Sequence, residues 1–356
     1  MQNLLNHILT LFLSLFFLAC EAPNSDTTSE GGGITQSENA DDDDNFVVTS
    51  YQEEDSKLKE IGLDDTTLVW ASTKMKGKKY DPKKPSFGYQ LNKPDDKEKL
   101  DKKLREISGI AYDEANDRLL AVNDEVGKVY TLHPRKGKLL SEQRFGFPGD
   151  YEDLTLHGEF LYVIKSDGFL HVLSVVSLTS IQKMSTGLAN SNDVEGICYD
   201  TETSRLLLAC KGSPDSRTAD APKKSRAVYA FDPVTQTLDQ NPFLLITEEA
   251  LKDFVEDNAK KKTKKKHLKK LVKRAKDIAP SAIGIHPISG RIYVLSSVGK
   301  LLVVFNRNQQ IEHVEFLSSK IHRQPEGLSF ASNGEMFISN EGQSGKGVLY
   351  RFEYNP

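Results

Sequence analysis

Short apolar runs separated by polar turns recur along the chain from residue 107 to residue 352. In the first repeat the runs are Gly109–Tyr112, Leu119–Val122 and Lys128–Leu132, and a more polar run, Leu139–Phe145, follows them. Runs rich in β-branched and aromatic residues and bounded by Asp, Asn, Gly and Pro are typical of strands joined by turns. The pattern therefore predicts an all-β protein with four strands in each repeat.

A short motif marks the start of each repeat. Its anchor positions, which we call the anchors, are Ser108, Glu152, Glu195, Ser281 and Glu326. Successive anchors are 44, 43, 86 and 45 residues apart, and we interpret the long step as one repeat plus an insertion. A period of roughly 40–45 residues with four strands per repeat is typical of a β-propeller blade. We predict five blades, starting near residues 106, 150, 193, 280 and 324.

The fifth repeat ends at the C-terminus after three strands. We expect Phe87–Leu91, just before the first repeat, to supply the missing fourth strand and so to remove an open sheet edge. The predicted fold is a five-bladed β-propeller within residues 51–356, closed by an N-terminal strand.

A helical insertion is predicted between blades 3 and 4, at residues 247–277. Glu248–Asn258 is helix-like, and Thr247 is a suitable N-cap. Lys260–Lys276 contains eleven Lys or Arg residues, and Leu268, Leu271 and Val272 share one helical face. Two interpretations stay open: a solvated helical hairpin packed on the rim of the propeller, or a surface that binds anionic lipids or polyanions.

The N-terminus resembles a bacterial lipoprotein signal. Ile8–Ala19 is almost wholly apolar, is too short to span a bilayer, and ends Phe17-Leu18-Ala19-Cys20. The resemblance implies that residues 1–20 are a signal peptide and that Cys20 is lipidated. An ordinary signal peptide or a short anchor is the alternative, because the segment before the apolar run lacks Lys and Arg. Residues 21–50 are expected to form a disordered acidic tether.

Composition adds few constraints. With 356 residues, 38% of them apolar, and a net charge of −4, the chain can form one large core and has no overall basic charge that would favour nucleic acid. Cys198 and Cys210 are expected to be buried thiols, since the predicted strand pairing does not place them opposite each other. We expect a monomer held at a membrane by its N-terminal lipid, with a protein partner on one propeller face.

Several motifs together resemble the SdiA-regulated (YjiK-like) family over about residues 87–354. They are Arg105–Tyr112, Ala121–Glu125, Gly149–Asp153, Asp193–Ile197, Tyr293–Ser297 and Gln324–Leu328. The resemblance implies a five-bladed propeller of the cell envelope, distantly similar to NHL-repeat proteins, with a calcium site. The chain departs from the family pattern in its insertion and in having Ser281 rather than an acid as the fourth anchor.

The anchors predict a cation site. Innermost strands line the channel of a propeller, so Glu152, Glu195 and Glu326 should converge at one end of it, where three carboxylates repel one another unless a cation binds or some of them protonate. Calcium accepts 6–8 oxygen ligands in loose geometry. Asn123 and Asn340, at the ends of second strands, are expected to add neutral oxygen ligands. The alternative is purely structural, with Lys165 and Lys211 pairing with the glutamates.

Three functions remain open from the sequence. The first is a lipid-anchored binding or scaffold module of the cell envelope with an axial calcium site. The second is a metal-dependent hydrolase of esters, lactones or phosphate esters, with an anchor glutamate as the base. The third is a structural envelope protein without metal. We assign no catalytic residue, because no Ser-His-Asp arrangement is found and His157 and His286 are expected to be solvent-side or structural.

Overall fold

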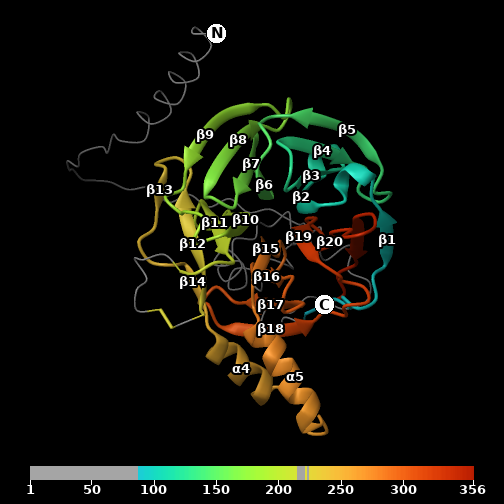
Figure 1. Ribbon diagram of the computed structural model, residues 1–356, viewed down its shortest axis with the longest axis vertical. Helices are drawn as coiled ribbons and strands as arrows, with labels where there is room; N and C mark the ends of the chain where they lie inside the picture. Colours follow the sequence, from blue (N-terminus) through green and yellow to red (C-terminus); the bar gives the residue numbers. More distant parts are fainter. Residues whose placement is uncertain (1–86, 215–220, 223) are drawn as a thin grey trace, which may run out of the picture. The chain divides into compact units, whose positions relative to one another are not determined.

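Five antiparallel sheets form a ring in the computed structural model, which describes residues 87–214, 221–222 and 224–356. The innermost strands contact one another in the cyclic order β2, β6, β10, β15, β19 and back to β2. Figure 1 shows the sheets arranged around this centre. The all-β fold with five blades is confirmed.

In blades 1 to 4 the strands run outward from the axis in chain order. Blade 1 consists of β2 (Ile107–Asp113), β3 (Arg118–Asn123), β4 (Lys128–Leu132) and β5 (Leu139–Arg144). Blade 2 consists of β6 (Tyr151–His157), β7 (Phe160–Lys165), β8 (Phe169–Ser174) and β9 (Ser180–Ser185). Blade 4 consists of β15 (Pro280–Ile285), β16 (Ile292–Ser296), β17 (Leu301–Phe305) and β18 (Ile311–Phe316).

Blade 3 has a divided outer edge. It consists of β10 (Val194–Asp200), β11 (Arg205–Cys210), β12 (Arg226–Asp232), β13 (Thr237–Leu238) and β14 (Leu244–Ile246). Both β13 and β14 pair with β12, one toward each of its ends. Cys198 and Cys210 are buried and do not form a disulfide with each other, because Cys198 is opposite Leu207 and Cys210 is opposite Val194.

Blade 5 joins the two ends of the described chain, but the closing strand is not the predicted one. Its strands are β19 (Pro325–Phe330), β20 (Met336–Asn340), β21 (Val348–Phe352) and β1 (Asp96–Lys99). Strand β1 pairs antiparallel with β21, and Lys97 is opposite Tyr350. An outer strand has one solvated face, which suits the polar residues of β1 better than the apolar Phe87–Leu91.

Phe87–Leu91 instead joins the core between blades 4 and 5. The Tyr89 side chain is buried in the same cluster as Tyr293 and Tyr354. Its hydroxyl lies 2.8 Å from His286 Nε2 and donates a hydrogen bond to the Gly334 carbonyl. The segment therefore fixes the closure through side chains rather than through a sheet ladder.

The insertion forms two helices on the outer side of blade 4, α4 (Glu248–Asp257) and α5 (Lys265–Lys276). Thr247 caps α4, as predicted, by accepting a hydrogen bond from Ala250 N at 3.2 Å. Leu268, Leu271 and Val272 pack against a hydrophobic cluster formed by buried residues of blades 3 and 4. The prediction of a helical hairpin packed on the rim is confirmed, and binding of lipids or polyanions by its basic face stays a prediction.

Arg274 attaches α5 to blade 4. Its Nε donates to the Gly299 carbonyl at 3.0 Å, and its Nη2 donates to the Leu317 carbonyl at 2.8 Å and to the Lys300 carbonyl. We expect Arg274→Ala to lower the unfolding free energy by about 2–3 kcal/mol, because buried carbonyls lose a charged donor. Urea denaturation followed by circular dichroism measures this change. Lys273→Ala, an exposed neighbour on the same helix, should change it by under about 0.5 kcal/mol, and equal effects would contradict the assignment.

The predicted signal peptide, Cys20 and the acidic tether lie outside the described residues. Within the described ranges, no helix is long and apolar enough to cross a membrane.

Candidate functional site

A β-bulge occurs at the anchor of every blade. In blades 2, 3 and 4 the register of the innermost pair shifts by one residue around Glu152, Glu195 and Ser281. In blades 1 and 5 the shift spans Ser108-Gly109 and Glu326-Gly327. A bulge leaves the extra residue outside the ladder and redirects its side chain. The motif repeated in the sequence is therefore the sequence of this bulge.

The five anchors line one cavity of about 290 Å³, which we call the acidic mouth. Its lining contains seven carboxylates, three of which are anchors, and a single lysine, Lys211. The carboxylates are Asp124, Asp150, Glu152, Asp193, Glu195, Glu326 and Glu341. The structure thus brings together the three glutamates that the sequence singled out.

The acidic mouth disfavours ionised carboxylates. Burial raises the pKa of Glu152, and the charges of Glu195 and Asp150 raise it further. Burial also raises the pKa of Glu195, although Lys211 opposes the shift. For Glu326, burial and then the charges of Glu195 and Glu341 raise the pKa to about 8. These carboxylates require a counter-charge if all of them are to ionise at neutral pH.

Lysine pairing supplies only part of that counter-charge. Lys211 Nζ lies 2.5 Å from Glu195 Oε1, as the structural alternative expected. Lys165 does not pair with Glu152 but binds Asp167 at 2.6 Å. Glu152 and Glu326 form no salt bridge within the part of the chain that the structure describes.

The two asparagines of the predicted ligand set lie apart from this cavity. Asn123 Nδ2 donates to the Lys103 carbonyl at 3.2 Å, and its Oδ1 accepts a hydrogen bond from Val126 N. Asn340 is buried, lines a neighbouring cavity, and has no hydrogen-bond partner at either Oδ1 or Nδ2. The acidic mouth is thus lined mainly by carboxylates, and metal binding by any of these residues stays a prediction.

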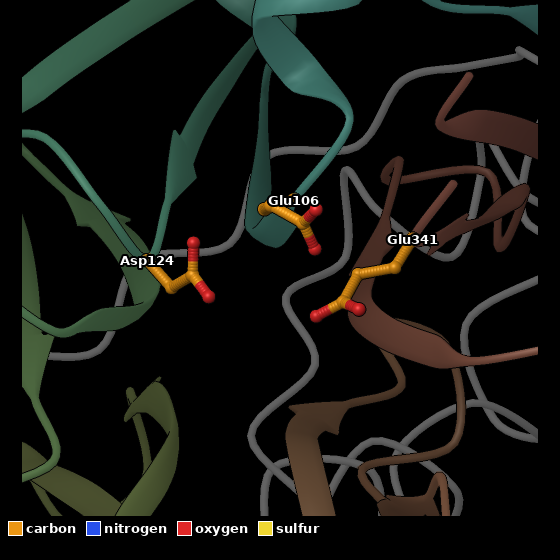
Figure 2. A group of neighbouring side chains, drawn as sticks. All are labelled: Glu106, Asp124 and Glu341. Carbon is orange, nitrogen blue, oxygen red and sulfur yellow. The ribbon is translucent and has the colours of Figure 1, made fainter. Parts of the chain in front are cut away.

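A second group of acids lies at the junction of blades 1 and 5. One carboxylate oxygen from each of Glu106, Asp124 and Glu341 lies within 4.8 Å of the other two. Figure 2 shows the three groups turned toward a common space between the blades. Burial raises the pKa of Asp124 to about 6 and of Glu341 to about 7. In both cases the negative charge of Glu106 is the next largest cause of the rise. Asp124 Oδ1 is buried without a hydrogen-bond partner. We call this group the junction cluster.

Only a weak sequence signal points to the junction cluster. Asp124 and Glu341 follow the asparagines that end the second strands of blades 1 and 5, where acids are more often turn residues that cap loops. Glu106 was not singled out. Its nearness to Glu341 depends on ring closure, in which Gly342 N donates to the Arg105 carbonyl at 2.7 Å.

The opposite end of the channel differs in character. Residues from all five innermost strands line a cavity of about 200 Å³ there, among them Ile110, Leu156, Ile197, Ile283 and Phe330. His157 lies near this end and stacks on Tyr199 with ring centroids 3.5 Å apart. His286 is fully buried, and its Nε2 lies 2.8 Å from the Tyr89 hydroxyl, whereas His157 is exposed; that neither histidine is catalytic stays a prediction.

Comparison with solved structures finds similar chains at low sequence identity. Glutaminyl cyclase from Myxococcus xanthus is 11% identical, with a TM-score of 0.48 over 74% of this chain and 96% of that one. A luciferin-regenerating enzyme is 10% identical, with a TM-score of 0.42 over 72% of this chain and 92% of that one. Neither similarity bears on the activity of this chain.

Sequence comparison is more specific. Among curated proteins no sequence matches the chain. The family model described as SdiA-regulated, however, matches residues 83–220 and 229–353. These ranges include both acidic groups and all five blades except the first three residues of β12, Arg226–Val228. The chain therefore belongs to the SdiA-regulated family.

Proposed function

We propose that the protein binds a calcium ion at the acidic mouth and acts as a binding or scaffold module of the cell envelope. One observation carries the proposal: seven carboxylates and one lysine line a single small cavity. A hard divalent cation with oxygen ligands balances such a set directly, and calcium tolerates its irregular geometry. The lining contains neither His nor Cys among the described residues, which disfavours zinc.

Two sets of three carboxylates are candidate ligands. One is the axial set, Glu152, Glu195 and Glu326, and the other is the junction cluster. The junction cluster has the tighter oxygen geometry and an unpartnered buried oxygen, Asp124 Oδ1. A cation held there would also link the first and last blades. Backbone carbonyls and water would complete six to eight ligands.

Titration of the calcium-free full chain with calcium, followed by calorimetry and thermal melting, tests the proposal. We expect about one ion per chain and a melting temperature that rises with calcium and falls with chelator. Two charge-matched triple variants locate the ion: E152Q/E195Q/E326Q, and E106Q/D124N/E341Q. The variant that removes the ligands should bind at least about tenfold more weakly. Unchanged melting on chelation and no bound metal would favour the structural alternative.

Metal-dependent hydrolysis is the second candidate. The pKa values of Glu341 and Glu326, raised to about 7 and about 8, suit general acid–base catalysis near neutral pH. Calcium-dependent turnover of p-nitrophenyl esters or phosphates, lost in E326Q or E341Q, would support it. Calcium binding without turnover would favour the binding module.

The envelope location is part of the proposal and rests on the sequence of residues 1–20. Metabolic labelling with a radioactive fatty acid tests it, with Cys20→Ser as the variant. We expect label in the parent protein and none in the variant, and label retained by the variant would contradict lipidation at Cys20.

A further inference from the structure

A second cavity, of about 500 Å³, lies beside the acidic mouth on blade 5. Strands β1 and β21, the loop between β18 and β19 and the loop between β20 and β21 form its walls. Glu341 belongs to the lining of both cavities, so the two are neighbours. We call the larger one the basic pocket.

Charge distinguishes the basic pocket from the acidic mouth. Five cationic side chains belong to its lining: Lys97, Lys99, Lys320, Arg323 and Lys346. Glu341 is the one carboxylate among its lining residues in the described ranges. None of the five cations forms a salt bridge within those ranges, although the same part of the chain contains many such pairs. The pocket therefore concentrates positive charge that the described chain does not neutralise.

Asn340 supplies an independent observation. Its side chain is 2% exposed and lines the basic pocket. Neither Oδ1 nor Nδ2 has a hydrogen-bond partner. A buried amide without partners is costly, and such groups are rare in native proteins. A ligand in the pocket that both accepts and donates hydrogen bonds would satisfy it.

The remaining lining is apolar. Ile321, Val348 and Tyr350 contribute to the wall, and the Tyr350 hydroxyl donates to the Ile321 carbonyl at 3.1 Å. Lys97 Nζ lies 5.8 Å from the centre of the Tyr350 ring, so this lysine spans the apolar and charged parts. The volume is within the range of small-molecule sites, roughly 300–1,000 Å³. An anion with an apolar body fits this division better than a bare inorganic ion does.

We propose that the basic pocket binds a small organic phosphate, with the phosphate among the lysines and Arg323, a hydroxyl or phosphate oxygen at Asn340, and an apolar body against Tyr350. A phosphate group carries up to two negative charges and several acceptor oxygens, which matches clustered point charges of Lys and the fork of Arg. The proposal does not depend on calcium binding at the acidic mouth.

Calorimetric titration of the full chain with phenyl phosphate tests the proposal, with inorganic phosphate and benzoate as comparison probes. We expect phenyl phosphate to bind more tightly than either, because only it combines two charges with an apolar ring. K320Q/R323Q should weaken binding of phenyl phosphate at least about tenfold, and N340A should weaken it as well. The control K136Q/K138Q makes the same charge change in the turn between β4 and β5 and should leave binding unchanged.

Two results would overturn the proposal. One is no measurable binding of phenyl phosphate up to about 10 mM at low salt. The other is equal weakening of phenyl phosphate binding in K320Q/R323Q and in the control K136Q/K138Q. That result would show that the weakening comes from the change in net charge alone. Retained binding in E152Q/E195Q/E326Q would separate this pocket from the calcium site, so failure of either proposal leaves the other measurable.

Discussion

Between pH 5 and pH 8, the unfolding free energy of the calcium-free protein should fall by about 3 kcal/mol or more. The cause is the group of buried glutamates in the acidic mouth. The pKa of Glu326 rises from 4.5 in the unfolded chain to about 8 in the folded protein. The pKa values of Glu152 and Glu195 are also raised by burial.

The direction of this pH dependence follows from the number of protons bound in the folded and unfolded states. Between the two pKa values, the folded protein keeps the Glu326 proton while the unfolded chain has lost it, so a rise in pH favours unfolding. The contribution of Glu326 to stability is fully present below about pH 4.5 and is lost as the pH rises to about 8. Lys211 moderates the effect, because it pairs with Glu195, whereas Asp150, Asp193 and Glu341 strengthen it.

Urea denaturation at a series of pH values, followed by circular dichroism, measures the effect. In E152Q/E195Q/E326Q the fall over this interval should be smaller than in the parent by about 3 kcal/mol, because amides do not titrate. A residual fall is expected from Asp124 and Glu341, whose pKa values are also raised, to about 6 and about 7. Saturating calcium should reverse or flatten the fall in the parent, since the ion stabilises the ionised carboxylates. The same slope in parent and variant would show that these glutamates do not control stability.

Replacement of Gly109 by alanine should destabilise the fold by about 3 kcal/mol or more. Gly109 follows the anchor of blade 1 on β2, where the innermost strand of blade 2 comes very close. A Cβ at this position would lie 2.5 Å from Asp153 Cα and 3.0 Å from its carbonyl carbon, so backbone rather than a flexible side chain would have to move. Thermal and urea denaturation of G109A measure the loss.

Gly345 provides the control. It lies in the loop between β20 and β21, and a Cβ there would meet only the Gly342 carbonyl oxygen, at 3.4 Å. We expect G345A to change the unfolding free energy by under about 1 kcal/mol. Equal stability of G109A and the parent would mean that the inner strands separate easily, against the packing seen here.

The close approach of the blades also explains the form of the repeated motif. Gly196 and Gly327 occupy the position after the anchor in blades 3 and 5, where a Cβ would lie within 3.0 Å of backbone atoms of the next blade. In blade 2 the corresponding residue is Asp153, which is buried and accepts a hydrogen bond from Ile197 N at 3.0 Å. The sequence displayed the motif, and contact between blades accounts for its residue types.

Local sequence patterns were enough to predict much of the fold of this protein. Strand and turn residues alternate within each repeat, so blade number, most strand positions and the two-helix insertion followed from short-range patterns. The convergence of Glu152, Glu195 and Glu326 followed as well, because equivalent positions of a closed repeat must face one axis. The separate positions of Asn123 and Asn340 did not follow, since they depend on loop conformations near the strand ends.

Only the tertiary structure decided which segment closes the ring of blades. Phe87–Leu91 has the stronger strand pattern, yet β1 pairs with β21, because the apolar segment is buried between blades while an outer strand tolerates polar residues. The junction cluster and the basic pocket arise the same way: each combines residues from near the first blade with residues more than 200 positions later. Repeats in the sequence determined the blades of this protein, whereas the pairing of β1 with β21 in the tertiary structure brought together sites that no local pattern contains.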